Sequence, residues 1–233
     1  MNGERIIAGK RCFLYGENNA KVLLIQPSGR DEEEFLEREV QVISEKAPGH
    51  AFQVLAFSVE DWNRELSPWE APPVFGSEAF GNGAAKTLAW IEKELLPALE
   101  STQGPSNRNF LGGYSLAGLF SLWAAYQTDR FAGVAAVSPS VWFPGWLETA
   151  EQKNCLCPAV YLSLGDREEK TRNRAMATVG SGIRRQAELL SGATESILEW
   201  NPGNHFNEPD VRMAKGFAWL LNRLQKEKED AEE

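Results

Sequence analysis

Histidine is scarce in this sequence. Its 233 residues include only His50 and His205, which excludes almost any metal site built from several histidines. A reaction that needs a histidine as its base therefore has two candidates, and their positions in the fold decide between them.

Cysteine is also rare, and its spacing does not suit a metal. One residue separates Cys155 from Cys157, whereas a zinc knuckle has two, and Cys12 lies far away in the sequence. We expect ordinary reduced thiols, no metal site and no cofactor.

The sequence also has no excess of positively charged residues and no long apolar run. Lys and Arg number 24 against 33 Asp and Glu, and the resulting net charge of -9 disfavours binding to nucleic acid or to an anionic membrane surface. No window approaches the ~18 apolar residues of a membrane span, and the first residues lack the apolar core of a signal peptide. We expect a soluble, cytoplasmic protein.

The length and composition predict one globular domain. Residues 1–233 suffice for one well-buried domain and are few for two, and no repeat or linker divides them. The acidic tail, residues 226–233, is predicted to be frayed and solvated. No oligomeric state is predicted.

Short apolar runs alternate with helical patterns along the chain. A hairpin is expected at residues 5–8 and 11–15, and later strands at residues 21–26, 52–59, 109–112, 131–137, 159–164 and 196–200. Helical patterns are expected at residues 31–43, 84–99, 116–127, 176–190 and 214–224, with Asp31 as a cap and Pro97 as an end or a kink. This alternation predicts an α/β fold with a doubly wound, mostly parallel sheet after an N-terminal hairpin. In such sheets ligands bind beyond the carboxyl ends of the strands.

Residues 112–118 read GGYSLAG and are similar to the G-x-S-x-G turn that presents a serine nucleophile between a strand and a helix. Gly113 supplies the small residue two places before Ser115. Ala117 can supply the small residue two places after it, because alanine adds only one methyl group. The strand before this turn and the apolar helix after it favour a nucleophile over the alternative, in which Ser115 only caps the helix that begins at Leu116.

A serine hydroxyl needs a base that takes its proton, and with this turn the order along the chain is serine, acid, histidine. His205 lies in NPGNHF, directly after the last predicted strand and on the same face as Ser115. His50 lies between a helix and the start of the next strand, at the opposite edge of the sheet. We therefore predict His205 as the base, the alternative being a loop histidine among turn residues.

The acid should follow the strand at residues 159–164, where GDREEK offers three carboxylates. Its role is to hold the histidine tautomer and to stabilise the imidazolium. In sheets with this serine turn the acid often sits three places after the glycine that ends the strand, which favours Glu168. Asp166 and Glu169 remain alternatives.

Two backbone amides are expected to hold the oxyanion. One should come from Leu116, directly after the serine, and the other from Ser28 or Gly29 in the loop after residues 21–26, with Ser28 preferred. The alternative for Pro27-Ser28-Gly29 is a turn that only ends a strand.

Several tryptophans lie in segments that should reach the same face of the sheet. Trp62, Trp69 and Trp142 are predicted to line a substrate pocket with flat, apolar walls. The alternative is that they only pack the long loop, residues 60–83, onto the sheet. No segment suggests a separate lid, which favours small esters over lipids.

Six segments carry a family resemblance: GGYSLAGLFSLWAA, SPSVWFPGW, YLSLGDREEKT, WNPGNHF, NRELSPW and GNGAAKTLAWIEKELLPALE. They resemble the Putative esterase family of α/β-hydrolases, which includes esterase D-like enzymes, ferulic acid esterase domains and siderophore esterases. The resemblance spans most of residues 20–222 and implies a sheet of the α/β-hydrolase type, with Ser115 as nucleophile, His205 as base and an acid in GDREE. The sequence departs from the family at Ala117, at Phe143 in place of a second tryptophan, and at IQPSG, which lacks the His-Gly or Asp-Gly of relatives.

Together these patterns predict a serine carboxylesterase that hydrolyses a small, soluble ester through an acyl-enzyme on Ser115. Two alternatives stay open. An alcohol could resolve the same acyl-enzyme, which would make the protein an acyltransferase, or the scaffold could be inactive and only bind a ligand.

Overall fold

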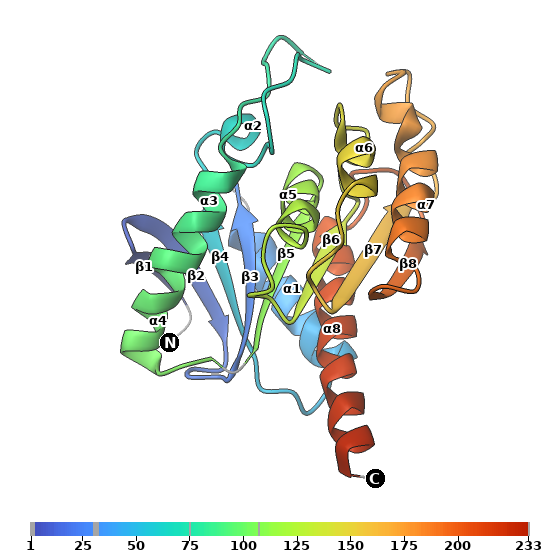
Figure 1. The fold of residues 1–233 in the computed structure, drawn as a ribbon. Coiled ribbons are helices and arrows are strands. Elements are labelled where there is room, and N and C mark those ends of the chain that lie inside the picture. Colours follow the sequence, from blue (N-terminus) through green and yellow to red (C-terminus); the bar gives the residue numbers. More distant parts are fainter. Residues whose placement is uncertain (1–2, 30–32, 75, 107, 233) are drawn as a thin grey trace.

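The computed structural model describes residues 3–29, 33–74, 76–106 and 108–232, and within them one sheet has the order β1-β2-β4-β3-β5-β6-β7-β8 (Figure 1). β1 pairs antiparallel with β2, and β2 with β4, whereas each neighbouring pair from β4 to β8 is parallel. The predicted α/β fold with an N-terminal hairpin is confirmed. The strands are β1 (Gly3–Ile7), β2 (Lys10–Gly16), β3 (Val22–Ser28), β4 (Gln53–Ser58), β5 (Arg108–Tyr114), β6 (Gly133–Val137), β7 (Ala159–Gly165) and β8 (Glu195–Asn201).

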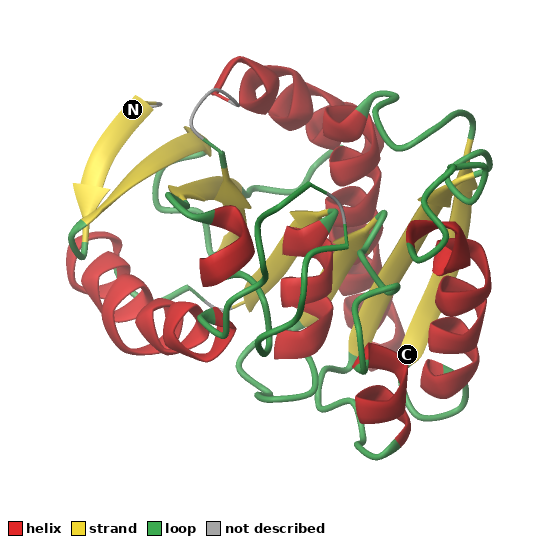
Figure 2. Cartoon of the chain, turned by 90° about the horizontal axis from the view of Figure 1, so that it is seen from above, coloured by secondary structure: helices red, strands yellow, loops and turns green. Residues whose placement is uncertain are grey.

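Helices cover both faces of this sheet (Figure 2). In β3, Leu24 packs into a core cluster with side chains of α1 and α8, while Leu23 and Ile25 point into a second cluster with side chains of α3, α5 and α7. The consecutive apolar residues at 22–25 of β3 therefore reflect burial on both sides. The helices are α1 (Glu33–Lys46), α2 (Trp62–Glu65), α3 (Ala84–Trp90), α4 (Leu96–Gln103), α5 (Leu116–Ala124), α6 (Trp146–Glu151), α7 (Val179–Leu190) and α8 (Pro209–Glu232).

The helix after residue 83 does not end at Pro97, so one of the two alternatives predicted for this proline, an end or a kink, is wrong. A π-helical turn, Ile91–Leu95, joins α3 to α4, and the amide of Leu96 donates to the carbonyl of Ile91, five residues back. Pro97 then occupies the first turn of α4, where a missing N–H leaves no hydrogen bond unmade. The wider turn restarts the helix just before the proline, so the chain continues as helix to Gln103.

Two other expectations differ from the structure in detail, and a third is not tested by it. The backbone of the acidic tail is helical, because α8 continues to Glu232 instead of fraying from residue 226. The long loop, residues 60–83, contains the short helix α2 and an isolated bridge between Ala71 and Phe80. Asp31, the predicted cap of the first helix, lies outside the described residues.

Four of the parallel strands are consecutive neighbours in the sheet, in the order β5, β6, β7 and β8. Their carboxyl ends therefore lie along one edge, where the chain leaves β5 at Tyr114, β7 at Gly165 and β8 at Asn201. The three segments with candidate chemistry follow directly after those three strands. In the described part of the chain, no helix combines the length and the apolar character that a membrane crossing requires.

Candidate active site

Ser115 occupies a strained turn between β5 and α5. Its φ of 59° and ψ of -119° are rare for a residue with a side chain, and its amide donates to the carbonyl of Val137 at 3.0 Å. A Cβ on Gly113 would collide with the Ala117 carbonyl and lie 2.8 Å from the Ala117 methyl. A Cβ on Gly118 would lie 2.9 Å from the carbonyl oxygens of both Gly113 and Val137. The alanine at position 117 is therefore small enough for the turn, because Gly113 leaves room for its methyl group. Gly118, one place beyond the usual second glycine, is needed because its backbone packs against two carbonyl oxygens.

The structure brings Ser115, His205 and Glu168 together. Ser115 Oγ lies 3.0 Å from Nε2 of His205, and Nδ1 of His205 lies 2.7 Å from Oε2 of Glu168. The Ser115 side chain makes no capping hydrogen bond to α5, so the structure does not support the alternative in which Ser115 only caps this helix. His50 lies between α1 and β4, and it is not among the described residues that line the cavities at Ser115.

The two other acidic candidates face elsewhere. Asp166 accepts a hydrogen bond from the amide of Gly203 at 2.8 Å, and its side chain is half exposed. Glu169 lies 3.5 Å from Arg184 at the surface. Of the three carboxylates that the sequence offers, Glu168 is the one that contacts the histidine.

The carboxylate of Glu168 is buried, with only 4% of its side chain exposed, and it accepts several hydrogen bonds. Oε1 accepts from Ser138 Oγ and from the Gly165 amide, both at 2.7 Å. Burial would raise the pKa of Glu168, but the hydrogen bonds and charge of His205, with those from Ser138 and Gly165, outweigh it and lower the pKa below its usual value. Glu168 is therefore held as a carboxylate.

Arg212, on the first turns of α8, was missed by the sequence analysis. It is 2% exposed, and its Nη1 lies 3.0 Å from Oε1 of Glu168. Its Nη2 donates to the carbonyls of Pro202 at 2.9 Å and Asn204 at 3.0 Å, in the loop that carries His205. A guanidinium is suited to this role because its donors form a fixed fork. One feature of the sequence indicates that Arg212 is buried. Arg212 precedes the buried Leu220 by about two helical turns, which places both residues on the same face of the helix.

Tyr114, directly before the serine, links the same parts. Its hydroxyl donates to the backbone carbonyl of His205 at 2.7 Å and accepts from Arg212 Nη1 at 3.1 Å. Its ring centroid lies 5.2 Å from that of His205. The histidine loop is therefore tied both to β5 and to α8, which limits the positions that its imidazole can take.

The two predicted oxyanion residues have different positions. Leu116 is the first residue of α5, where an amide has no partner within the helix, and it lines a cavity at Ser115. Ser28 lies within β3, 1% exposed, and its carbonyl accepts from the amide of Val59, next to β4. The N–H and C=O of a strand residue point to the same side, so the Ser28 amide is directed at β4 and away from β5. The prediction for Ser28 is not supported.

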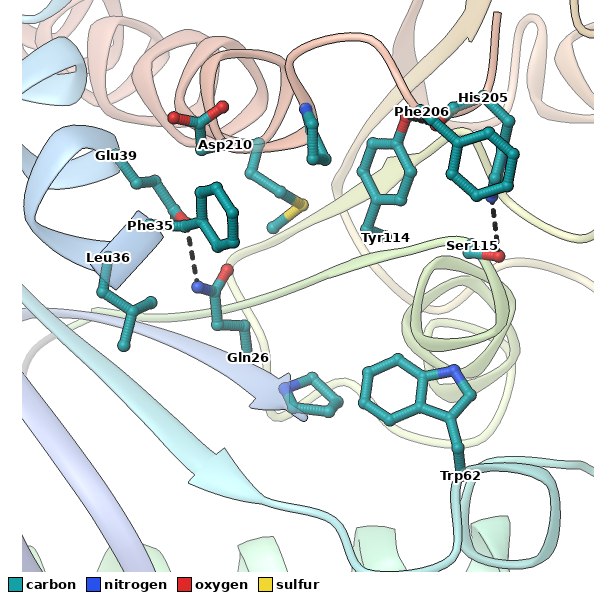
Figure 3. A pocket seen from close by; sticks show the side chains of 13 residues that line it. Gln26, Phe35, Leu36, Glu39, Trp62, Tyr114, Ser115, His205, Phe206 and Asp210 are labelled. Atoms are coloured by element: carbon teal, nitrogen blue, oxygen red, sulfur yellow. Dashed lines mark hydrogen bonds between the residues drawn. The ribbon is translucent and has the colours of Figure 1, made fainter. Parts of the chain in front are cut away.

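Two cavities flank the serine, and both are lined by Trp62, Ser115, His205 and Phe206. The larger cavity, about 600 Å³, extends toward α7 and includes Trp142. The smaller cavity, about 330 Å³, extends toward α1 and α8 (Figure 3). Phe206 is 86% exposed and lies at the boundary between them, a position that the sequence analysis did not identify.

The predicted pocket tryptophans separate into two groups. Trp62 lines both cavities and Trp142 lines the larger one. Trp69 is not among the described lining residues: its indole donates to the carbonyl of Pro144 at 2.8 Å, and its ring packs edge-on against Phe143. Trp69 thus fastens the long loop to the segment after β6, which is the packing role that the sequence left open.

Potential metal ligands do not gather in the part of the chain that the structure describes. It contains no group of three or more His, Cys, Asp or Glu side chains in a position to hold an ion.

Comparisons with known proteins give one matching family model and several solved structures with a similar fold. The family model described as Putative esterase matches residues 53–195. An IroE-like serine hydrolase from Shewanella oneidensis is 16% identical, with a TM-score of 0.80 over 95% of this chain and 80% of that one. The siderophore hydrolase EstA from Aspergillus nidulans is 20% identical, with a TM-score of 0.72 over 91% of this chain and 90% of its own.

A third solved structure is longer than this chain. The enterobactin esterase FES from Shigella flexneri is 17% identical, with a TM-score of 0.66 over 92% of this chain and 56% of its own. Comparison with curated protein sequences gives no match.

Proposed function

Because the chain belongs to the Putative esterase family, we propose that this esterase is a serine carboxylesterase with Ser115 as nucleophile, His205 as base and Glu168 as the acid. The observation that carries the proposal is the continuous chain of contacts from Ser115 Oγ through the imidazole of His205 to Glu168, at 3.0 and 2.7 Å. A serine, a histidine and a carboxylate in this arrangement activate a hydroxyl for acyl transfer.

The first step begins from one histidine tautomer. Because the Glu168 carboxylate can only accept, Nδ1 of His205 carries the proton and Nε2 is left to accept the Ser115 hydroxyl proton. Ser115 Oγ attacks the ester carbonyl carbon while its proton passes to Nε2. The resulting imidazolium lies against Glu168, whose negative charge stabilises it.

The attack produces a tetrahedral intermediate, which then collapses and releases the alcohol. The Leu116 amide, at the start of α5, donates to the oxyanion. The bond between the carbonyl carbon and the alcohol oxygen breaks, and His205 gives its proton to the departing alcohol. His205 then takes a proton from a water molecule, whose oxygen attacks the acyl carbonyl carbon. The bond from that carbon to Ser115 Oγ breaks, His205 returns the proton to Oγ, and the carboxylic acid is released.

The two cavities at Ser115 fit an ester with a modest group on each side of the reacting carbonyl. Volumes of about 330 and 600 Å³ suit small-molecule ligands. The similar structures from Aspergillus nidulans and Shigella flexneri are described as a siderophore hydrolase and an enterobactin esterase. Siderophore esters therefore belong in the substrate panel for this protein, beside acetyl, butyryl and feruloyl esters.

Fluorophosphonate labelling tests the proposal directly. The wild type is expected to carry the label on Ser115, as mapped by mass spectrometry of its peptides, and to hydrolyse p-nitrophenyl acetate. Ser115→Ala should abolish labelling and lower kcat by at least about 10³-fold, whereas Ser181→Ala, at an exposed serine of α7, should behave as the wild type. Full activity of Ser115→Ala, or a label on another serine, would overturn the assignment.

A further inference from the structure

The smaller cavity has apolar walls and a polar far end. Phe35 and Leu36 of α1 and Met213 of α8 contribute apolar walls, and Ser115 and His205 lie at one side. Gln26 of β3 and Glu39 of α1 form the polar end (Figure 3). A molecule that extends from Ser115 into this cavity therefore reaches the buried polar side chains of Gln26 and Glu39 at its far end.

Gln26 has an unused acceptor in this cavity. The residue is 5% exposed, and its Nε2 donates to Oε2 of Glu39 at 3.0 Å. When Glu39 is ionised it can only accept, so the amide nitrogen of Gln26 faces it and Oε1 lies on the other arm. The other arm, Oε1, has no hydrogen-bond partner among the described residues. A buried carbonyl oxygen without a donor is costly, so this position favours a ligand that brings a donor.

The charges around the cavity favour the same kind of ligand. The described lining includes the carboxylates of Glu39 and Asp210, 3% and 4% exposed, and no Lys or Arg. Arg38, whose side chain is 54% exposed, pairs with Asp210 at 3.1 Å and balances its charge. The polar side chains at the far end therefore present acceptors to a ligand, and the described lining contributes no cation.

We propose that the smaller cavity binds the part of the ester that ends in a hydroxyl or ammonium group, with Gln26 Oε1 as acceptor and the Glu39 carboxylate beside it. This inference rests on the serine mechanism proposed above, because it assigns one end of the cavity to the reacting carbonyl at Ser115. The apolar walls accommodate a methylene chain between that carbonyl and the donor. The substrate class is then an ester with a remote donor on a short aliphatic arm.

Matched pairs of esters test this assignment. In the acyl series, p-nitrophenyl 6-hydroxyhexanoate and 6-aminohexanoate are compared with the heptanoate, in which a methyl group replaces the donor. In the alcohol series, 6-hydroxyhexyl and 6-aminohexyl acetate are compared with heptyl acetate by acetate release. The wild type should prefer a donor-bearing ester by about tenfold in kcat/KM in one series, since a site with a buried acceptor discriminates against an analogue that lacks the donor.

A substitution at Gln26 identifies the acceptor. Gln26→Met keeps the length of the side chain and removes Oε1, so the preference should fall to about twofold or less. Phe35→Leu alters the same cavity without changing a polar group, and it should leave the ratio between paired esters unchanged. Circular dichroism melting curves establish that each variant is folded. The wild-type ratio by itself decides the substrate class if Gln26→Met is unfolded.

Each outcome bears on one claim. Equal turnover of donor and methyl esters in both series overturns the inference and leaves the esterase mechanism intact. The same holds if Gln26→Met keeps the full wild-type preference for the donor-bearing ester. Absence of hydrolysis of every ester, p-nitrophenyl acetate included, overturns the proposed mechanism. In that case calorimetric titration of Ser115→Ala with the same pairs decides the binding claim, which stands only if the donor ester binds tighter.

Discussion

Nη1 of Arg212 lies 3.0 Å from Oε1 of Glu168, on the opposite side of the carboxylate from His205. The side chains of both residues are nearly inaccessible to solvent, at 3% and 4% exposure. A buried cation on the last helix thus contacts the same acid that contacts the histidine. The arginine also holds the carbonyls of Pro202 and Asn204, so it positions the acid and the histidine loop together.

Arg212→Gln should lower both stability and activity. Removing one member of a buried ion pair typically costs about 3–5 kcal/mol, which urea unfolding measures. Because the guanidinium positions both Glu168 and the loop that carries His205, kcat should fall in Arg212→Gln while KM stays close to that of the wild type. Arg212→Lys keeps the charge but not the fork of donors, and should restore part of the stability and little of the kcat. An unchanged kcat in folded Arg212→Gln would leave Arg212 a purely structural residue.

Glu168→Gln tests the acid against its two neighbours in the sequence. An amide at this position can donate to Nδ1, which would favour the tautomer with its proton on Nε2 and remove the base. The kcat on p-nitrophenyl acetate should fall by about 10³- to 10⁴-fold. Asp166→Asn and Glu169→Gln, which do not contact His205, should stay within about twofold. A larger loss in either of those variants would move the acid to that residue.

The lowered pKa of Glu168 predicts how stability depends on pH. A carboxylate whose pKa is lower in the folded state stabilises the fold above its usual value of 4.5, and this contribution is lost as pH falls through the folded pKa. Urea unfolding of the wild type and of Glu168→Gln should therefore differ most near neutral pH, with the difference shrinking below about pH 4.5. A difference that stays constant down to pH 3 would contradict the prediction.

The serine turn predicts opposite results at two adjacent positions. Gly118→Ala places a methyl group 2.9 Å from two carbonyl oxygens and should destabilise the protein by about 1–3 kcal/mol, with loss of activity as Ser115 shifts. Ala117→Gly opens space and should cost at most about 1 kcal/mol through helix propensity, with kcat near that of the wild type. Thermal melting and p-nitrophenyl acetate hydrolysis measure both effects, and equal tolerance at 117 and 118 would contradict this account.

Two tryptophans of the long loop should behave differently on substitution. Trp62→Ala changes a wall of both cavities, so KM values and the order of preference among esters should change. Trp69→Phe removes the hydrogen bond to Pro144, and it should lower stability by about 1 kcal/mol and leave that order unchanged. Steady-state kinetics on the ester panel, together with urea unfolding, separate these results. An altered order of preference in Trp69→Phe would give that residue a substrate role.

Local patterns in the sequence predicted the fold and placed Ser115, His205 and an acid of GDREEK at one edge, because parallel strands end there together. The choice of Glu168 over Asp166 and Glu169 came from a tendency of sheets with this serine turn, and only the packed structure shows which carboxylate contacts His205. The direction of the Ser28 amide depends on hydrogen bonding to β4, a partner that sequence alternation does not identify. The continuation of the helix through Pro97 required a π turn that no apolar pattern indicates.

Arg212 and Gln26 illustrate a second limit of the sequence. A lone arginine or glutamine in a sequence is usually solvent-exposed, and only the packed structure reveals that each is buried against a particular carboxylate. The segments after the strands contain the residues that the motifs identify, whereas Arg212 lies on helix α8 and Gln26 lies inside strand β3. The partners of Arg212 and Gln26 lie far from them in the sequence and close to them only in the folded protein, so sequence spacing does not identify them.

The loop before helix α8 carries His205, whereas Ser115 and Glu168 follow β5 and β7, earlier in the chain. Ribosomal synthesis therefore produces Ser115 and Glu168 before the proposed base, His205, and before the Met213 wall of the smaller cavity. Under the proposed mechanism, a nascent chain that has reached only β7 should be inert toward cellular esters.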